Sequence, residues 1–292
     1  MANLDLRKFK ALIFDCYGTL VDWEEGIYQA IQPMIQRVKP PISSREDVLL
    51  AFTNVEKDLQ AKYPTMLYKD ILAHTHAELA ARLQNKPAHP DDAQSVAVAE
   101  VSARSGDSVQ SAITTAGTSI AASVTLSEAR GLTDEDIAFG NSVGSWKPFP
   151  DTIPALKTLS NHYKLTILSN VDNDSFSKTR TVLERSDPNY QFEFDGIYTA
   201  QDIGSYKPDL ANFEYALKKL KDNFGIEKHE VLITACSLLH DHVPANQLKM
   251  NSVWVARDGA VMRQDPSIAT YDLKFTTLGA MAEEVEKKAG TK

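Results

Sequence analysis

Cysteine is scarce in this chain, and long apolar runs are missing from it. Cys16 and Cys236 are the two cysteines among 292 residues, too few for a disulfide framework and more typical of a reducing compartment. No segment approaches the run of about 18 apolar residues that a membrane-spanning helix needs, and no apolar stretch precedes residue 11 to serve as a signal peptide. We therefore expect an intracellular protein, cytoplasmic in location, without a membrane partner.

Positive charge is also in short supply. The chain has 31 Lys and Arg against 39 Asp and Glu, which gives a formal net charge of -8, and its basic residues do not cluster. Nucleic-acid affinity depends on neutralising phosphates with clustered Lys and Arg, so we expect no nucleic-acid partner. The remaining composition, 43% hydrophobic and 24% charged, is ordinary for a globular protein, and the length is sufficient for a large core.

The first distinctive segment is a short apolar run that leads into a carboxylate. Ala11 to Phe14 has the length of a central strand of a parallel sheet, and it does not alternate because such a strand is buried on both faces. Asp15 follows at the carboxyl end of this run, and Gly18 allows the chain to turn. Open α/β sheets bind ligands at this end of their strands, so Asp15 is the leading candidate for a reactive group.

Strands and helices alternate regularly in the second half of the chain. We expect further strands at residues 164–168, 194–199, 231–235 and 252–256, helices at 175–184 and 210–224, and an earlier helix that Asp151 caps and that ends at Leu159. This order indicates an α/β fold with a Rossmann-like doubly wound parallel sheet as its core.

Residues 23–83 have a different pattern. Apolar residues recur there at helical spacing with no strand-like run, which predicts an inserted helical region whose first helix breaks at Pro40-Pro41 and whose second starts at Ser43-Ser44. A segment rich in Ala, Ser and Thr follows at residues 84–131. Such a segment cannot offset the entropy of ordering by burial, so we expect a mobile loop or weakly packed helices.

Polar side chains follow four of the predicted strands. Asp15 follows the first, Ser169 and Asn170 follow the second, Lys207 lies in the loop after the third, and Asp241 comes after the fourth. Because the carboxyl ends of parallel strands share one edge of a sheet, we expect these side chains to converge. Each also has an ordinary explanation when taken alone: a turn for Ser169-Asn170, a solvated loop for Lys207 and a helix cap for Asp241.

The string from Asp15 to Asp22, DCYGTLVD, resembles the first motif of the haloacid dehalogenase superfamily. Together with Ser169-Asn170, Lys207 and Asp241, it follows the four motifs of that superfamily in order. The resemblance implies a hydrolase whose nucleophile, Asp15, forms an ester with the substrate.

The same resemblance divides the chain into two domains. It implies a core of residues 1–20 and 147–292, and a helical cap domain of residues 21–146 that contains the insertion at about 84–131. The expected partner is a small anionic organic substrate, and a homodimer is a candidate assembly.

The remaining motif residues take roles around the nucleophile. A fixed positive charge at Lys207 would hold Asp15 ionised and steady an anionic substrate. Asp241 would assist the water that attacks the ester. The candidates for substrate binding are side chains that can contact the nucleophile, a substrate carboxylate or a leaving group: Tyr17, Thr19, Trp23, Ser169 and Asn170.

Tyr17 separates the branches of the superfamily. Its phosphatases carry a second Asp two residues after the nucleophile and need Mg2+, whereas this chain has Tyr17 there, and its fourth motif offers Asp241 without a paired acid. The pattern is most similar to the 2-haloacid dehalogenase (type II) branch, which implies hydrolytic dehalogenation of short 2-haloalkanoic acids with no cofactor and no metal. A Mg2+-dependent small-molecule phosphatase is the alternative.

One residue of that branch is missing from the place where the resemblance puts it. The halide-binding arginine of the cap should fall near Phe52 to Glu56, and no Arg is there. A halide would then need Trp23 or Asn170. A catalytically impaired protein that binds a metabolite is a further alternative.

Two more alternatives involve histidine. Cys16, with His240 or His242 and Asp241, contains the elements of a cysteine hydrolase, and the pair His240 and His242 could ligate a metal. A packed thiol and an ordinary loop pair explain the same residues without chemistry.

Overall fold

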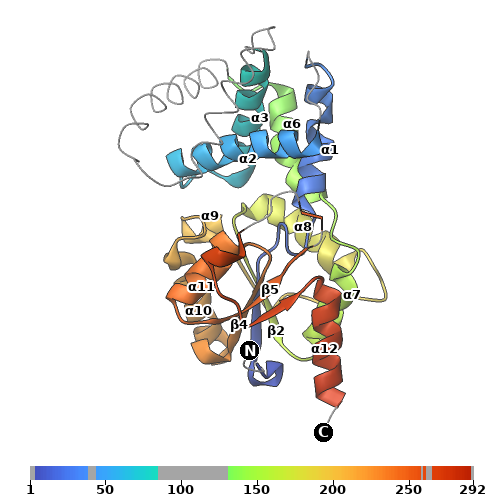
Figure 1. Ribbon diagram of the computed structural model, residues 1–292, viewed down its shortest axis with the longest axis vertical. Helices are drawn as coiled ribbons and strands as arrows, with labels where there is room; N and C mark the ends of the chain where they lie inside the picture. Colours follow the sequence, from blue (N-terminus) through green and yellow to red (C-terminus); the bar gives the residue numbers. More distant parts are fainter. Residues whose placement is uncertain (1–3, 39–43, 85–130, 258, 261–264, 291–292) are drawn as a thin grey trace.

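A six-stranded parallel sheet forms the centre of the fold (Figure 1). The computed structural model describes residues 4–38, 44–84, 131–257, 259–260 and 265–290. The sheet order is β3-β2-β1-β4-β5-β6, so Asp15 follows a central strand and the predicted α/β fold is confirmed. The strands are β1 (Ala11–Phe14), β2 (Lys164–Ser169), β3 (Gly196–Thr199), β4 (Val231–Ala235), β5 (Asn251–Val255) and β6 (Leu273–Phe275).

Successive residues of the central strand enter two different hydrophobic clusters, because side chains of a strand alternate between its faces. Leu12 and Phe14 pack into the cluster that contains Leu156 of helix α7 (Thr152–Ser160) and Met281 of helix α12 (Leu278–Gly290). Ala11 and Ile13 pack into the cluster on the other face, which includes Phe213, Ala216 and Leu220 of helix α10 (Leu210–Phe224). Burial on both faces explains why this strand is apolar throughout.

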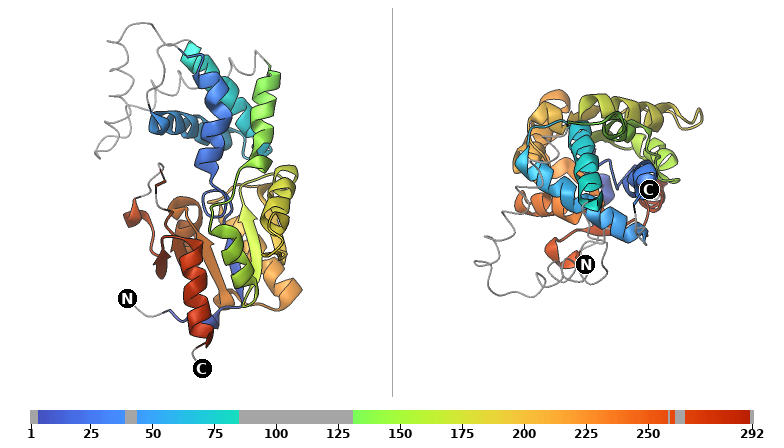
Figure 2. Two further views of the ribbon diagram at one scale, coloured as in Figure 1. Left: turned by 90° about the vertical axis from the view of Figure 1, so that its right-hand side faces the viewer. Right: turned by 90° about the horizontal axis from the view of Figure 1, so that it is seen from above.

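Helices cover both faces of the sheet (Figure 2). The helices of this part of the chain are α7 (Thr152–Ser160), α8 (Asn173–Arg185), α9 (Ala200–Ile203), α10 (Leu210–Phe224), α11 (Val243–Gln247) and α12 (Leu278–Gly290). Shorter turns of helix are η1 (Leu6–Lys8), η3 (Asn141–Ser145), η4 (Lys228–Glu230), η5 (Leu238–His242) and η6 (Pro266–Ile268).

Two strand predictions need correction. Strand β6 was not predicted, because its three residues at the sheet edge are only partly buried and give a weak apolar signal. Strand β3 begins at Gly196 rather than residue 194. Phe194 precedes it as a buried loop residue, and its backbone N–H donates to Glu184 Oε1 at 2.8 Å instead of to a neighbouring strand.

Among the described residues, four helices lie together at one end of the molecule, beyond the sheet (Figures 1 and 2). They are α1 (Trp23–Ile35), α2 (Arg45–Lys62), α3 (Tyr68–Gln84) and α6 (Asp134–Gly140), and we call them the cap helices. The helical character expected for residues 23–83 is confirmed, and Ser44 caps α2 by accepting from the Asp47 N–H at 3.0 Å. Helix α1 ends at Ile35, earlier than predicted.

The domain limits at residues 20/21 and 146/147 stay a prediction. Pro40-Pro41 and nearly all of the insertion at 84–131 lie outside the described residues. Within the part of the chain that the structure describes, no helix combines the length and apolar character that a membrane crossing needs.

The chain enters and leaves the cap helices along two adjacent segments. The Asp22 N–H donates to Lys147 O at 2.9 Å, and the Phe149 N–H donates to Leu20 O at 3.0 Å. Val21 and Pro148 pair as an antiparallel bridge between these bonds. The segment after Asp15 is therefore fixed to the segment that returns from the cap helices.

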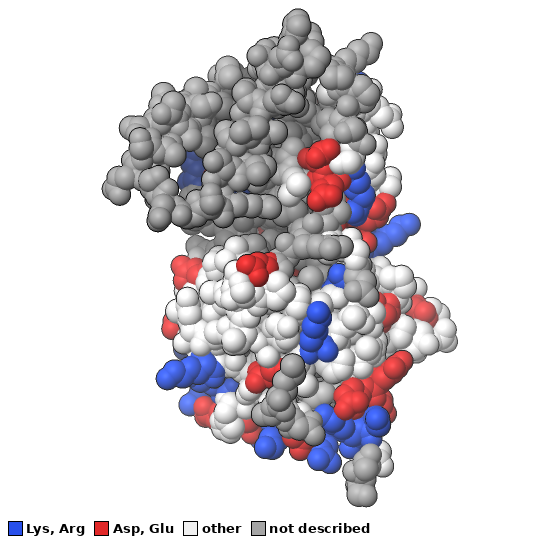
Figure 3. All heavy atoms as spheres, in the orientation of Figure 1, with Lys and Arg blue, Asp and Glu red and all other residues white. Residues whose placement is uncertain are grey.

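Charged side chains are interspersed over the visible surface (Figure 3). Blue and red groups alternate over the described residues of the sheet-containing part, without a large basic patch on this face. This distribution agrees with the acidic composition of the chain.

Candidate active site

Three charged side chains from distant parts of the sequence meet at the carboxyl edge of the sheet. The Lys207 ammonium lies 2.8 Å from Asp15 Oδ1 and 2.8 Å from Asp241 Oδ1, and it donates its third hydrogen bond to Leu168 O at 2.9 Å. All three charged side chains are buried. The convergence expected from the order of the strands is thus present in the structure.

The elements around the site explain this meeting. Asp15 directly follows β1, and Asp241 lies in η5 after the adjacent strand β4. Lys207 arrives from the loop after α9 and crosses the end of β2, where Leu168 accepts its bond. The Asn170 side chain holds the Lys207 backbone at both groups, with Asn170 Nδ2 donating to Lys207 O at 3.0 Å and the Lys207 N–H donating to Asn170 Oδ1 at 2.7 Å.

Thr19 binds the second oxygen of the Asp15 carboxylate. Its Oγ1 donates to Asp15 Oδ2 at 2.7 Å and accepts from the Cys236 N–H at 2.8 Å. Asp15 is thus held by one hydrogen bond at each oxygen. Gly18 makes the turn between Asp15 and Thr19 with φ +96°, a left-handed conformation that suits glycine. The Trp23 ring covers Gly18 so closely that a Cβ there would lie 2.9 Å from Trp23 Nε1.

Burial and the neighbouring charges oppose one another at Lys207 and Asp241. Burial would lower the pKa of Lys207, but the carboxylates of Asp15 and Asp241 outweigh burial and raise it, so the ammonium stays charged. Burial raises the pKa of Asp241 to about 7, against the opposing attraction of Lys207. Asp241 can therefore exchange a proton near neutral pH.

Two buried oxygens at the site have no hydrogen-bond partner among the described residues: Asp241 Oδ2 and Ser169 Oγ. An unpaired buried polar group costs about 1–3 kcal/mol, so native proteins seldom keep one without a reason. Both atoms are suited to contact a polar group of a substrate or a reacting water.

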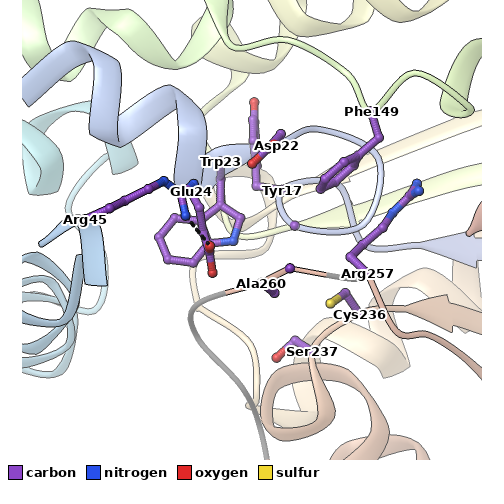
Figure 4. A pocket seen from close by; sticks show the side chains of 12 residues that line it. Tyr17, Asp22, Trp23, Glu24, Arg45, Phe149, Cys236, Ser237, Arg257 and Ala260 are labelled. Atoms are coloured by element: carbon purple, nitrogen blue, oxygen red, sulfur yellow. Dashed lines mark hydrogen bonds and ion pairs between the residues drawn. The ribbon is translucent and has the colours of Figure 1, made fainter. Parts of the chain in front are cut away.

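A cavity of about 110 Å³ lies next to these residues, between the first turns of α1 and α2 and the ends of β4 and β5 (Figure 4). Asp15 is not among its lining residues, but Tyr17 and Gly18 from its loop are. The lining consists of Tyr17, Gly18, Asp22, Trp23, Glu24, Arg45, Phe149, Cys236, Ser237, Arg257, Gly259 and Ala260.

Arg45 places a positive charge from the cap helices at the wall of the cavity. It lies in the first turn of α2, several residues before the segment 52–56 where an arginine was sought. Its guanidinium contacts are long, 3.4 Å to Glu24 Oε2 and 3.5 Å to Glu25 Oε2, and its side chain is 31% exposed. Residues 52–56 contain no arginine, and the positive charge comes instead from the start of α2, which the capping serine Ser44 marks in the sequence.

Tyr17 and Trp23 form apolar walls of the cavity. The Tyr17 hydroxyl pairs with Thr179 Oγ1 at 2.9 Å, and its ring packs edge-on against Trp146 with centroids 5.8 Å apart. Burial raises the pKa of Tyr17 well above its usual value. Tyr17 therefore does not replace the acidic Asp that the phosphatases carry at this position.

The alternatives based on Cys16 and the histidines do not fit the structure. Cys16 is fully buried in the hydrophobic core, and burial raises the pKa of its thiol well above its usual value. His242 has both ring nitrogens in use: Nε2 donates to Ala235 O at 3.1 Å, and Nδ1 then accepts from Ser252 Oγ at 2.9 Å. Neither a thiolate nucleophile nor a histidine metal pair is formed.

The two carboxylates of the site are the groups that a Mg2+ ion would need at this edge of the sheet. This ion takes oxygen ligands in near-octahedral geometry, usually with carboxylates among them. The facing oxygens of Asp15 and Asp241 share the Lys207 ammonium instead. No group of three or more His, Cys, Asp and Glu that could hold a metal occurs among the residues with described positions.

Solved structures with this fold include several hydrolases. The fold is similar to that of the defluorinating L-2-haloacid dehalogenase Rha0230, with TM-score 0.63 and 16% identity, covering 95% of this chain and 95% of that chain. It is also similar to L-2-haloacid dehalogenase from Xanthobacter autotrophicus with chloropropionic acid covalently bound, with TM-score 0.62 and 14% identity, covering 97% and 100%. The magnesium-bound HAD-hydrolase YfnB from Bacillus subtilis has TM-score 0.60 and 12% identity, covering 95% and 99%.

At such low identities these structures establish a common fold, and no curated protein matches the sequence. The family model for haloacid dehalogenase-like hydrolases, however, matches residues 9–233, more than half of the chain. That match includes Asp15, Ser169 and Lys207. The chain belongs to the haloacid dehalogenase-like hydrolases.

Proposed function

We propose that this enzyme removes halide from short 2-haloalkanoic acids by hydrolysis, through an ester on Asp15. The observation that carries the proposal is the Lys207 ammonium held at 2.8 Å from both Asp15 and Asp241, with Tyr17 where the phosphatases carry their acid. This arrangement supplies a nucleophile, a fixed positive charge and a base, without a general acid for an alcohol leaving group.

The first step is displacement at carbon. One oxygen of the Asp15 carboxylate bonds to C2 of the substrate, the carbon–halogen bond breaks, and the halide leaves with its electron pair. Lys207 and Thr19 hold the carboxylate oriented by one bond to each oxygen. Since a halide needs no proton in order to leave, the absence of an acid at position 17 is no obstacle.

The second step is hydrolysis of the ester. Asp241 takes a proton from a water molecule, whose oxygen attacks the acyl carbon of the Asp15 ester. The bond between this carbon and the oxygen attached to C2 breaks as that oxygen takes the proton back from Asp241, and the 2-hydroxy acid is released. The second proton of the water leaves to solvent, so Asp15 and Asp241 return to carboxylates. One oxygen of Asp15 then comes from water. The unpaired Asp241 Oδ2 is the atom that would accept the proton.

The cavity favours a small anion. It is small, with a volume of about 110 Å³, which suits a short organic acid. Arg45 gives it a positive charge for the departing halide, and Tyr17 and Trp23 give it apolar walls. The buried Ser169 hydroxyl is available to donate to the substrate carboxylate. The bound chloropropionic acid of the Xanthobacter relative is a molecule of this kind.

The test is a pair of assays on one preparation. Halide release from chloroacetate and 2-chloropropionate is measured with a chelator present, and phosphate release from p-nitrophenyl phosphate is measured with Mg2+. We expect halide release that the chelator does not reduce, since we propose a reaction without metal. Phosphate release alone, abolished by chelator, would favour the phosphatase, and no activity in either assay would favour a metabolite-binding role.

A further inference from the structure

Arg257 lies beyond the end of β5 and is 92% buried, which is unusual for an arginine. Its guanidinium donates twice to Thr19 O, from Nε at 3.0 Å and from Nη2 at 2.7 Å. Nη1 donates to Asp151 Oδ1 at 2.6 Å, and the guanidinium carbon lies 4.1 Å from the centroid of the Phe149 ring. Arg257 therefore joins the nucleophile loop to the segment that returns from the cap helices.

The Asp151 side chain pairs with Arg257 and does not cap the helix that it precedes. It was predicted to cap α7, but its side chain makes no cap bond there. Asp151 Oδ2 accepts from the Gly279 N–H at 3.0 Å, at the start of α12. Burial would raise the pKa of Asp151, but the Gly279 N–H and Arg257 outweigh burial and hold it below its usual value. Asp151 is thus a charged anchor for Arg257.

The hydrogen bonds of Arg257 are connected to Asp15 through a single residue, Thr19. Thr19 is held at its carbonyl by Arg257 and at its hydroxyl by the Cys236 N–H, and the same hydroxyl donates to Asp15 Oδ2. The position of the Thr19 hydroxyl therefore depends on the hydrogen bonds made at the Thr19 carbonyl as well as on its own bond from the Cys236 N–H. A shift of the carbonyl would move the hydrogen bond that orients Asp15.

Arg257 also lines the cavity, so direct contact with substrate is the competing explanation. In Figure 4 its guanidinium lies beside Phe149, on the opposite side of the cavity from Arg45. Its known bonds go to Thr19, Asp151 and Thr152, with Nη2 at 3.2 Å from Thr152 Oγ1. Both nitrogens that approach Thr19 are committed to the protein.

We propose that Arg257, anchored by Asp151, is a positioning residue that fixes the Thr19 carbonyl and thereby the orientation of the Asp15 carboxylate. This inference rests on the proposed function in so far as it concerns turnover. It follows from geometry, since a guanidinium fork can bind the carbonyl and the carboxylate together, whereas the single ammonium of a lysine cannot reproduce the fork.

The test compares R257K and D151N with wild type and with R180K. Arg180 pairs with Glu184 on α8 and has 41% of its side chain exposed, so R180K controls for the change of an arginine ion pair. For R257K we expect kcat to fall by about 10- to 100-fold, the effect of a small misplacement of a reacting group. KM should stay within about twofold, because Arg257 does not bind substrate. D151N should also lower kcat, but by a smaller factor than R257K does.

A second measurement does not depend on turnover. Amide hydrogen exchange of the peptide covering residues 15–23 should be faster in R257K and D151N than in wild type and R180K, with exchange of α8 unchanged. Unaltered exchange and a kcat within twofold of wild type would overturn the proposal. A large rise in KM with kcat preserved would also overturn it, since that result indicates substrate contact.

The two proposals fail separately. If wild type releases no halide, the proposed function is wrong, and the exchange experiment alone decides whether Arg257 fixes the loop. If wild type is active and R257K matches it, only the positioning role is lost.

Discussion

Lys207 is the residue on which the site depends most, because it separates two carboxylates that would otherwise face each other in a buried space. The Lys207 side chain is only 1% exposed, so solvent does little to weaken these ion pairs. The same ammonium fixes one oxygen of the Asp15 carboxylate by a hydrogen bond of 2.8 Å.

Replacement of Lys207 should therefore damage both activity and stability. In K207M, we expect halide release to fall by at least about 100-fold, because Asp15 loses the positive charge and the hydrogen bond that orient it. Removing one partner of a buried ion pair costs about 3–5 kcal/mol, which urea unfolding would measure. K164Q is the matched control: Lys164 pairs with Asp195 at 2.7 Å but is 49% exposed, so its loss should cost about 1 kcal/mol or less. Equal effects of the two substitutions would contradict this role.

Asp241 should give the second step its pH dependence. Burial raises its pKa to about 7, and the proposed base is active only when it is ionised. The rate of ester hydrolysis should therefore rise with pH through about 7 and then level off, as single-turnover measurements would show. D241N should release about one halide per enzyme and then stop, because the ester still forms but is not hydrolysed. Continued turnover of D241N would rule out Asp241 as the base.

The residues that sequence patterns located and those that they missed differ in one physical respect. Asp15, Lys207 and Asp241 follow strands of a parallel sheet, and the sheet fixes where such positions meet. Arg45 reaches the cavity only through the packing of the cap helices on the sheet. Arg257 finds its partner 106 residues away, a separation that no local pattern reveals.

At the scale of elements, the central strands were predictable and the edges were not. Strand β1 is apolar throughout because both of its faces are buried, a pattern that is strong even in four residues. Strand β6 is short and partly exposed, so its composition does not distinguish it from a loop. Asp151 has the residue type and position of a helix cap, but its side chain pairs with the distant Arg257 and makes no cap bond.

Helices α2 and α3 share a buried carboxyl group, which should make their packing sensitive to pH. The Tyr68 hydroxyl donates to Glu56 Oε1 at 2.8 Å. Burial raises the pKa of Glu56 to about 7, although this bond opposes burial. Because the folded-state pKa exceeds the ordinary value of 4.5, Glu56 stabilises the fold fully below that value, and the contribution is lost as pH rises through about 7.

E56Q should remove this dependence. Its free energy of unfolding should exceed that of wild type by up to about 3 kcal/mol at a pH of about 8, and should differ little at a pH of about 5. Urea unfolding at the two pH values measures the difference, with E46Q as control because Glu46 is exposed on the same helix. A difference that does not change with pH would contradict the assignment.

At the scale of the whole molecule, two hydrogen bonds fix the cap helices over the sheet. The Tyr206 hydroxyl donates to Met66 O at 2.6 Å, and the Lys69 N–H donates to Asp172 Oδ2 at 3.1 Å. Tyr206 immediately precedes Lys207, so the position of the cap helices is connected to that of the proposed catalytic lysine. The sequence predicted helical structure over residues 23–83 but did not predict α6, and the placement of the cap helices depends on contacts between segments far apart in the chain.

Other properties of the whole molecule stay predictions. A cytoplasmic location is an expectation that cell fractionation would test, and a homodimer is a candidate assembly that sedimentation or light scattering would test. The domain limits at residues 20/21 and 146/147 are open to limited proteolysis.

The formation of an ester on Asp15 is tested most directly by the fate of its oxygen atoms. The enzyme is allowed many turnovers of 2-chloropropionate in water enriched in 18O, and the peptide that contains Asp15 is then weighed by mass spectrometry. We expect 18O in the Asp15 carboxylate, because water attacks the acyl carbon of the ester in every cycle. Halide release with no 18O in Asp15 would contradict the covalent mechanism.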